Sequence, residues 1–243
     1  MNHQYAGFTD VGANREINQD SILMLSNGEL GLFCVADGMG GHLDGGKASR
    51  TIVDNLNQWW IDYNLDTFNG DMMKLMLSLE QYLENANKEI ISFTPNGQIC
   101  GSTAVVLLIY KDIYGLISIG DSRVYLKRGF KISQLTVDQT WENQPGNYIS
   151  DHKKKQDLRY GKLVNAVGCF NNLNIFSHTD SVKKNSVFAL CSDGIYKYVN
   201  QQLFRSKIRR AKGDNLESIL VDIKKNVYDN GAGDNLSLIL IHV

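Results

Sequence analysis

Proline is scarce in this chain, with 2 residues among 243. A disordered linker or a proline-rich tail is therefore not expected. An excess of charge of either sign is also missing, since 25 Lys and Arg residues face 26 Asp and Glu residues and the formal net charge is -1. This balance argues against the global basic field that attracts nucleic acid or an anionic membrane surface.

Long apolar runs and a secretory leader are also absent. No segment approaches the roughly 18 consecutive apolar residues of a membrane span. The first residues lack the basic region and apolar stretch of a signal peptide. These absences predict a cytoplasmic protein that contacts neither nucleic acid nor membrane. Since nothing in the sequence divides the chain, we expect residues 1–243 to form a single domain that acts as a monomer.

The residue spacings of zinc and dithiol redox centres are missing as well. The 4 cysteines form no C-x-x-C pair, and the 5 histidines form no H-x-x-x-H pair. Cys34 and Cys191 lie inside apolar runs, where a thiol acts as a small core side chain. A metal site in this chain would therefore have to be built from oxygen ligands.

Two kinds of periodicity are present in the sequence. Apolar residues at three- and four-residue steps predict helices over 45–64, 71–93 and 214–227, the last opened by Asp214 and Glu217 as a capping box. Clusters of strands with helix pairs between them favour antiparallel sheets packed with helices. Residues 140–163 are polar and predict a surface excursion. The strands are expected at Ile22–Leu25, Leu32–Ala36, Thr103–Tyr110, Ile113–Ile119, Arg123–Lys127, Val187–Cys191 and Leu236–Ile241.

Five aspartates lie at the ends of these predicted strands. Asp20 and Asp234 come just before a strand, whereas Asp37, Asp121 and Asp193 directly follow one. If neighbouring strands are antiparallel, all five carboxylates can collect at one edge of the sheets. Two carboxylates about 4 Å apart repel by roughly 4 kcal/mol at an effective dielectric near 20. The cluster therefore predicts bound cations.

The ligand type narrows the choice of metal. Sites made only of oxygen suit Mg²⁺, Mn²⁺ or Ca²⁺, whereas zinc sites usually include His or Cys. A pair of Mg²⁺ or Mn²⁺ ions bridged by one carboxylate fits best. An aspartate beside a strand is by itself commonly a turn residue. Five of them with neighbouring glycines or small polar residues favour the metal interpretation.

Six short segments rich in glycine and small polar residues, five of them with aspartate, occur across nearly the full chain. In composition and order they resemble the motifs of the PP2C-type (PPM) metal-dependent Ser/Thr protein phosphatases, in the short bacterial form that consists of the catalytic domain alone. Each segment alone is a weak match, but six in order are specific. The segments are Thr9–Ser21, Ala36–His42, Gly101–Ala104, Ile119–Arg123, Cys191–Gly194 and Gly233–Ser237.

The resemblance implies a four-layer α-β-β-α sandwich, an α+β fold in which helix pairs flank two antiparallel sheets. It also implies a centre of two Mn²⁺ or Mg²⁺ ions at one end of the sandwich. Asp37 would bridge both ions, and the carbonyl of Gly38 would coordinate one of them. Asp193 and Asp234 would be terminal ligands of the other ion, and Asp20 would hold metal-bound water.

Two further roles follow from the resemblance. Asp121, together with Asp193, matches the site of a weaker third ion in bacterial members of the family. Arg15 corresponds to the arginine that binds the substrate phosphate, a role that suits a planar guanidinium.

The implied reaction is hydrolysis of phosphoserine and phosphothreonine on proteins, here the substrates of a bacterial Ser/Thr kinase. A hydroxide that bridges two ions about 3.5–4 Å apart would attack phosphorus in line. Asp37 would hold both ions. Together with Arg15, the ions would neutralise the charge on the phosphoryl oxygens. No protein nucleophile is needed, and the sequence contains neither a cysteine-phosphatase loop nor a G-x-S-x-G elbow.

Four residues depart from the family pattern. Met39 stands where many eukaryotic members carry a histidine proposed as general acid, and Gln19 stands where others have Glu. Gln139 replaces a usual histidine, and Asn165 replaces a usual arginine. The last two lie outside the metal core, so they concern substrate choice more than chemistry. His42, which follows the second motif, is expected to be a loop residue.

Two alternative functions remain open from the sequence. A pseudophosphatase would bind a phosphoprotein without turning it over, but such proteins usually lose metal ligands and this chain keeps the full set. A phosphatase dedicated to one regulator of a partner-switching pathway is the second alternative, and the altered Gln139 and Asn165 favour it mildly.

Overall fold

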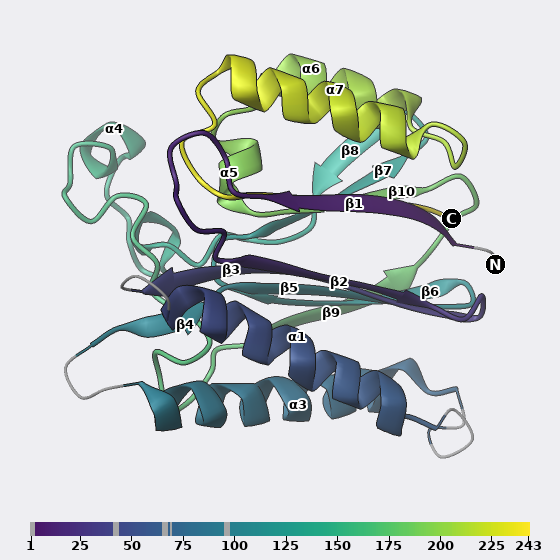
Figure 1. Cartoon of the computed structure of the whole chain (residues 1–243), viewed down its shortest axis with the longest axis horizontal. Coiled ribbons are helices and arrows are strands. Elements are labelled where there is room, and N and C mark those ends of the chain that lie inside the picture. The colour runs from purple at the N-terminus through teal and green to yellow at the C-terminus, as the bar shows by residue number, and fades with distance from the viewer. Residues whose placement is uncertain (1–2, 41–43, 65–67, 69, 95–97) are drawn as a thin grey trace.

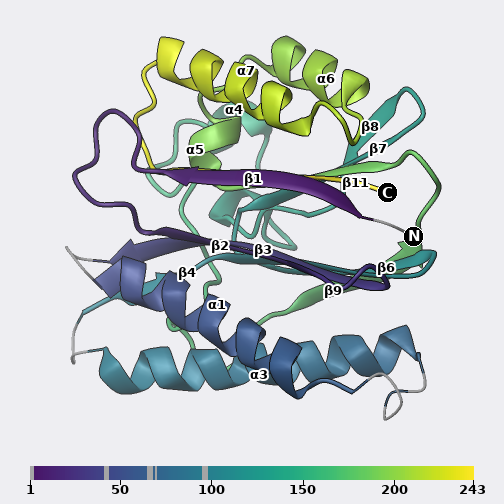
Figure 2. The same ribbon diagram turned by 45° about the vertical axis from the view of Figure 1, so that its right-hand side comes forward.

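Two antiparallel sheets lie face to face in this molecule, and helices cover the outer side of each (Figures 1 and 2). The predicted α+β class with four α-β-β-α layers is therefore confirmed. The computed structural model that shows this arrangement describes residues 3–40, 44–64, 68, 70–94 and 98–243.

The first sheet, which we call the β3 sheet, has the strand order β2-β3-β5-β6-β9, and β4 pairs with β3 outside that path. Every strand pair in it is antiparallel. Its strands are β2 (Asp20–Ser26), β3 (Leu30–Gly40), β4 (Cys100–Ser102), β5 (Ala104–Tyr110), β6 (Ile113–Ile119) and β9 (Phe176–Ser181).

The second sheet, the β11 sheet, has the order β1-β11-β10-β7-β8 and is also antiparallel throughout. It joins the first strand of the chain to the last, because β1 pairs with β11 along its whole length. Its strands are β1 (Gln4–Asp10), β7 (Arg123–Arg128), β8 (Lys131–Gln134), β10 (Val187–Cys191) and β11 (Leu236–His242).

The helices form the two outer layers. α1 (Asp44–Asp62) and α3 (Met72–Phe93) pack on the β3 sheet, and α6 (Gln201–Arg210) and α7 (Leu216–Asp229) cover the β11 sheet (Figure 1). α5 (Asp193–Tyr196) is a single turn that follows β10. None of the helices in the described part of the chain is long and apolar enough to cross a membrane.

Apolar residues fill all three spaces between the four layers. Along β3, Leu32 and Cys34 face α1 and α3, whereas Phe33 and Val35 face the β11 sheet. Because successive side chains of a strand point to opposite faces, a strand buried on both sides reads as a continuous apolar run. Burial of roughly 25 cal/mol per Å² of apolar surface then holds the layers together.

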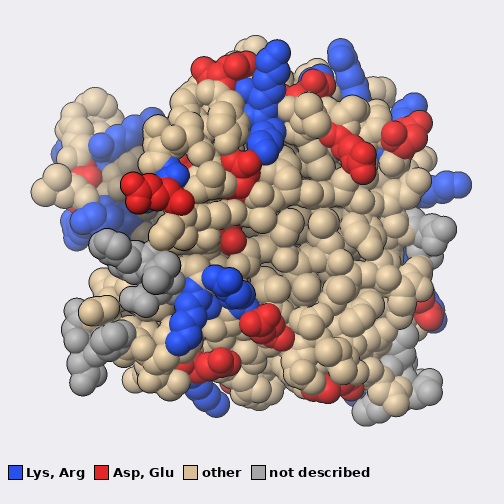
Figure 3. Space-filling model, viewed as in Figure 1, with Lys and Arg blue, Asp and Glu red and all other residues tan. Residues whose placement is uncertain are grey.

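Residues 140–163 leave the body of the molecule and return to it. The segment is closed at its base, where Thr140 pairs with Leu163 and Trp141 N–H donates to the Lys162 carbonyl at 2.9 Å. It contains the short helices η1 (Trp141–Asn143) and α4 (Asp151–Lys154). Figure 1 shows α4 projecting beside the sandwich, and Figure 3 shows acidic and basic side chains interspersed over the visible face.

One local prediction is wrong. α7 begins after Asn215 rather than at Asp214, and no side chain caps its first turn. The Asn215 side chain instead accepts a hydrogen bond from the Lys212 N–H at 2.8 Å. The expected capping box with Glu217 is therefore not formed.

Candidate metal centre

Asp20 and Asp37 come from neighbouring strands of the β3 sheet. Asp20 is the first residue of β2, and Asp37 lies directly opposite it on β3. The sequence predicted that Asp37 follows its strand, but β3 continues to Gly40 because its last residues pair with β4. Directly opposed residues present their side chains on the same face of a sheet, so these two carboxylates are neighbours.

Asp193 and Asp234 come from the β11 sheet. Asp193 follows β10 and begins α5, and Asp234 lies just before β11. β10 and β11 are antiparallel neighbours, so the end of one strand lies beside the start of the other. Asp121 lies between β6 and β7, where the chain passes from one sheet to the other.

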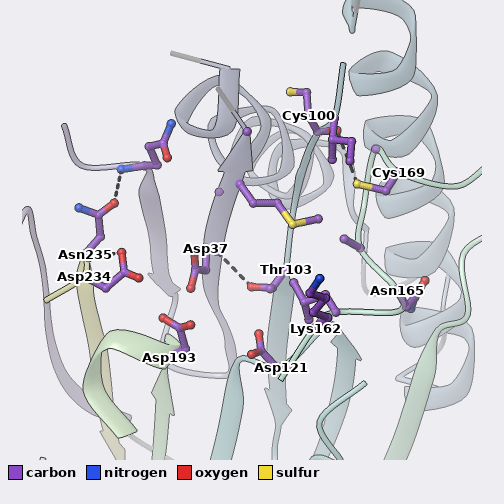
Figure 4. A pocket seen from close by; sticks show the side chains of 18 of the residues that line it. Asp37, Cys100, Thr103, Asp121, Lys162, Asn165, Cys169, Asp193, Asp234 and Asn235 are labelled. Carbon is purple, nitrogen blue, oxygen red and sulfur yellow. Dashed lines mark hydrogen bonds between the residues drawn. The ribbon is translucent and has the colours of Figure 1, made fainter. Parts of the chain in front are cut away.

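A pocket of about 690 Å³ opens where the two sheets meet at this edge. Figure 4 shows the carboxylates of Asp37, Asp193 and Asp234 around a shared space, with Asp121 beside Asp193. Asp20 does not line the pocket but lies buried behind it, with 6% of its surface exposed. The predicted residues that line the pocket are Arg15, Asp37, Gly38, Asp121, Asp193 and Asp234.

Negative charge is most crowded at Asp37. Burial, followed by repulsion from Asp20, Asp193, Asp121 and Asp234, raises the pKa of Asp37 well above 3.8. All the other carboxylates of the predicted set therefore act on this one side chain. Crowding of this kind needs either protons or cations to become tolerable.

Asp20 is a buried acid with one carboxylate oxygen left unpaired. Ser192 Oγ donates to Asp20 Oδ2 at 2.8 Å, but Asp20 Oδ1 is buried without a hydrogen-bond partner. Burial above all, with repulsion from Asp193 and Asp234, raises the pKa of Asp20 to about 7. An unpaired polar atom in the interior is costly, so this oxygen is suited to hold a water molecule or an ion.

Two basic side chains form ion pairs with the aspartates of the β11 sheet. The Arg15 guanidinium reaches both carboxylate oxygens of Asp234, with Nε to Oδ1 at 2.9 Å and Nη2 to Oδ2 at 3.0 Å. Lys197 Nζ lies 2.5 Å from Asp193 Oδ2. The sequence reading assigned no role to Lys197, although its spacing of four residues from Asp193 places both on one side of a helical turn.

Asp121 is held by an aromatic neighbour. Tyr196 Oη donates to Asp121 Oδ2 at 3.1 Å. Burial first, then repulsion from Asp193, raises the pKa of Asp121 to about 6. The Tyr196 ring in turn packs against the Arg123 guanidinium, whose carbon lies 3.5 Å from the ring centroid. Tyr196, which contacts Asp121 without lining the pocket, is a second residue that the sequence did not point to.

Gly38 is a position where a side chain cannot be accommodated. A Cβ atom there would lie 2.1 Å from the carbonyl oxygen of Gly45 and 2.5 Å from that of Gln19. The backbone next to Asp37 is therefore packed tightly against the start of α1. Thr103 Oγ1 accepts a hydrogen bond from the Asp37 N–H at 3.1 Å and fixes the same stretch from the other side (Figure 4).

The loop that carries Arg15 is anchored by Asn235. The Asn235 side chain donates to the carbonyls of Val11 and Ile17 at 2.8 and 3.0 Å and accepts from the Gln19 N–H at 2.9 Å. One amide thus holds both ends of the Arg15 loop against the start of β11. The sequence placed Asn235 in a motif without indicating this role, because the contact joins residues 216 positions apart.

Gln139 and Asn165, the two departures outside the metal core, contact each other. Asn165 Nδ2 donates to Gln139 Oε1 at 2.7 Å, and the same oxygen accepts from the Gly120 N–H at 2.7 Å. Both side-chain amides also donate to the Asn174 carbonyl, at 3.0 and 2.8 Å. The two changes therefore form one neutral network beside Asp121, and Asn165 faces the pocket.

The donor set fits divalent ions of the Mg²⁺ or Mn²⁺ type, since it consists of carboxylate and carbonyl oxygens. The unpartnered Asp20 Oδ1 supports this fit. Within the described residues, no three Asp, Glu, His or Cys side chains are already drawn together tightly enough to hold an ion. Since Asp193 and Asp234 are engaged by Lys197 and Arg15, ion binding would require these pairs to loosen.

A four-layer sandwich with an all-oxygen acidic pocket at one edge defines a class of metal-dependent hydrolases. The family model described as protein phosphatase 2C matches residues 12–218. The chain therefore belongs to the protein phosphatase 2C family of serine/threonine protein phosphatases, as its six motifs implied. Asp234 lies beyond the residues that the family model matches.

Of the other residues singled out in the sequence, Met39 and Gln19 line the pocket. His42 lies outside the described residues.

Individual relatives cover nearly the whole chain. The serine/threonine phosphatase stp of Listeria monocytogenes is 25% identical over 96% of this chain and 93% of its own length. The serine/threonine phosphatase of S. agalactiae has the same fold, with a TM-score of 0.88 at 21% identity and 99% of both chains covered. The catalytic domain of phosphatase PstP, solved with 2 manganese ions, aligns with a TM-score of 0.80 at 22% identity, covering 99% of this chain and 97% of its own.

Proposed function

We propose that this phosphatase uses two divalent cations, Mn²⁺ or Mg²⁺, held at the acidic edge of its sheets. The observation that carries the proposal is that four other carboxylates act on Asp37, in a pocket that also contains an arginine. Asp37 is the residue best placed to be shared by both ions. The two manganese ions of the related PstP structure support the same stoichiometry.

The remaining ligands come from both sheets. The Gly38 carbonyl would serve one ion, Asp193 and Asp234 the other, and Asp20 would hold a coordinated water through its unpartnered oxygen. When bound, such ions supply a water molecule activated for attack on phosphorus near neutral pH. Asp121 would contribute to a weaker third site.

Arg15 is the residue proposed to bind the substrate phosphate. Its guanidinium already holds a carboxylate through two hydrogen bonds, and the same planar fork fits two phosphoryl oxygens. Asp234 would hold an ion in the loaded enzyme, and the Arg15 guanidinium, no longer needed to neutralise that carboxylate, would be free to bind the phosphate. Asn235 keeps the backbone of the Arg15 loop in place while the side chain turns.

The hydroxyl groups near the centre hold the aspartates in position and do not act as nucleophiles. Thr103 Oγ1 lies 2.7 Å from Ser122 Oγ and also receives the Asp37 N–H. The Ser192 hydroxyl donates a hydrogen bond to Asp20. These hydroxyls hold the aspartates in place, which leaves the attacking oxygen to water.

We infer that the substrates are proteins phosphorylated by a bacterial Ser/Thr kinase, since the named relatives are bacterial Ser/Thr phosphatases. The complete set of carboxylates at this edge, four lining the pocket and Asp20 buried beside Asp37, favours turnover over binding without turnover. Gln139 and Asn165 form a neutral network beside the pocket, where the family resemblance implies a histidine and an arginine, and this difference favours a narrow choice of phosphoprotein.

The deciding experiment is a turnover assay on p-nitrophenyl phosphate and on a phosphothreonine peptide, with EDTA-treated protein and after addition of Mn²⁺ or Mg²⁺. We expect no turnover in EDTA and restored turnover with either ion. Full activity in metal-free protein would refute the metal mechanism. Tight binding of the phosphopeptide without hydrolysis at any metal concentration would instead identify a pseudophosphatase.

A further inference from the structure

Lys197 lies at the edge of the pocket where Asp121 and Asp193 meet. It closes the single turn of α5, which Asp193 opens, so the two side chains lie on the same side of that turn. Lys197 Nζ is 2.5 Å from Asp193 Oδ2, and both residues line the pocket. The ammonium group is therefore part of the pocket wall.

Tyr196 and Lys197, which are adjacent in sequence, contact the carboxylates of Asp121 and Asp193. Tyr196 Oη donates to Asp121 Oδ2 at 3.1 Å, while the next residue, Lys197, pairs with Asp193. Tyr196 is itself held in position by the Arg123 guanidinium. The chain thus supplies one hydroxyl and one positive charge at the place where a weaker third ion is expected.

An ion pair spaced by four residues on a surface helix commonly contributes little. This pair differs in its surroundings, because the Asp193 side chain is only 16% exposed while that of Lys197 is 51% exposed. Burial disfavours the positive charge of Lys197, but Asp193, and after it Asp121 and Asp37, favour that charge and raise the pKa of the ammonium group. Its ammonium group therefore acts on three members of the acidic set.

We propose that Lys197 is a built-in cation that competes with a divalent ion for the Asp121–Asp193 edge of the pocket. While the ammonium group holds Asp193 Oδ2, that oxygen is not available to an ion, and a third ion enters only by displacing Lys197. The inference rests on the metal dependence proposed above. It makes residue 197 a determinant of how many ions the enzyme holds at a given metal concentration.

The test is a calorimetric Mn²⁺ titration of the metal-free chain, with Lys197→Met as the variant. Lys207→Met is the matched control, since Lys207 pairs with Asp222 between α6 and α7, away from the pocket. Removing one charge at Lys197 should tighten the weakest Mn²⁺ site by about tenfold or more. The control should titrate like the wild-type chain.

A second measurement does not depend on resolving that weak site. Without metal, Lys197→Met should unfold at a lower temperature than the wild type, because Asp193 loses its partner. Saturating Mn²⁺ should then raise the unfolding temperature of this variant more than that of the wild type. The Lys207→Met control should show the wild-type increase.

The outcomes separate this inference from the proposed function. If the wild-type chain binds no Mn²⁺, the metal mechanism itself fails. If the wild type binds Mn²⁺ but Lys197→Met shows the same titration and the same increase in unfolding temperature, only the role of Lys197 is refuted. An increase in KM for the phosphopeptide with unchanged Mn²⁺ binding would likewise overturn it and make Lys197 a phosphate contact.

Discussion

The two sheets contribute acids to the same pocket in different ways. On the β3 sheet, Asp20 and Asp37 are built into paired strands, and their pKa values are raised by burial and mutual repulsion. On the β11 sheet, Asp193 and Asp234 lie at strand ends, where Lys197 and Arg15 reach them. In the metal-free chain, one half of the pocket therefore tolerates its charge through protons and the other half through ion pairs.

This difference follows from local structure. Asp20 and Asp37 lie opposite each other on paired strands, whereas Arg15 lies on a loop and Lys197 follows the single turn of α5. Arg15 and Lys197 are also half exposed, with side-chain exposures of 53% and 51%. Metal binding would then require proton release from the β3 side and displacement of ammonium or guanidinium groups from the β11 side.

The largest expected effect is that of Asp37→Asn on the β3 side. If Asp37 is shared by both ions, as proposed, its loss should lower kcat by about a thousand-fold or more, since neither ion would be held correctly. The metal-free variant should nevertheless be more stable than wild type, by on the order of 1 kcal/mol, because folding no longer has to bury a repelled carboxylate or take up the proton that neutralises it. Steady-state kinetics and urea unfolding in EDTA measure the two effects. Wild-type kcat in this variant would move the metal centre elsewhere.

A pH titration of stability sharpens the comparison. The pKa of Asp20 is 3.8 ordinarily and about 7 in the folded chain, so the folded state holds a proton that the unfolded state has released. Stability of the metal-free chain should therefore fall as pH rises between 4 and 7, by an amount on the order of a few kcal/mol.

The matched control for this titration is Asp20→Asn, which should lack the Asp20 contribution. It is needed because burial lowers the pKa values of His3 and His242, and these groups stabilise the fold as pH rises through the same range. Identical pH slopes for the wild type and Asp20→Asn in EDTA would contradict the protonated state assigned to the β3 side.

Arg15→Ala tests the cation on the other side of the pocket. We expect KM for a phosphate ester to rise by about tenfold, with a smaller change in kcat, because a phosphate contact is lost. Mn²⁺ affinity should stay near the wild-type value or increase, since Asp234 is freed. Loss of the tight ions in this variant would show that Arg15 supports metal binding instead.

The smallest effect is expected for the stability of Asp193→Asn. This substitution removes repulsion from Asp37 but also leaves Lys197 without its partner, so the metal-free chain should stay within about 0.5 kcal/mol of wild type. Compared with Asp37→Asn, this result would separate the two halves of the pocket. An equal gain in stability for both variants would show that the ion pair contributes nothing.

The acidic set could be predicted because its members follow or precede short apolar strands, a pattern visible along the sequence. The ends of the strands were harder to predict from the sequence. Asp37 was placed after its strand, since only the pairing of β3 with β4 reveals that the strand continues. The ion pairs formed by Lys197 and Arg15 could not be predicted, because they depend on side-chain directions that residue spacing alone does not give.

The missed elements share a composition that conceals them. β1 (Gln4–Asp10) and β9 (Phe176–Ser181) are edge strands with mainly polar, partly exposed residues, so an aliphatic pattern does not mark them. α6 (Gln201–Arg210) buries only Phe204 and Ile208 and is otherwise polar and basic. In each case the neighbouring layer supplies the stabilising contacts, and a single-sequence pattern does not contain that information.

The pairing of β1 with β11 also affects how the phosphatase is made. β1 lies at the edge of its sheet, and its neighbour there is the final strand described. During synthesis β1 must wait for almost the whole chain before it finds a partner, and such distant pairings slow folding. The Arg15 loop depends on Asn235 at the start of that same late strand. The Arg15 loop is therefore fixed only at the stage of folding at which the β11 sheet is completed.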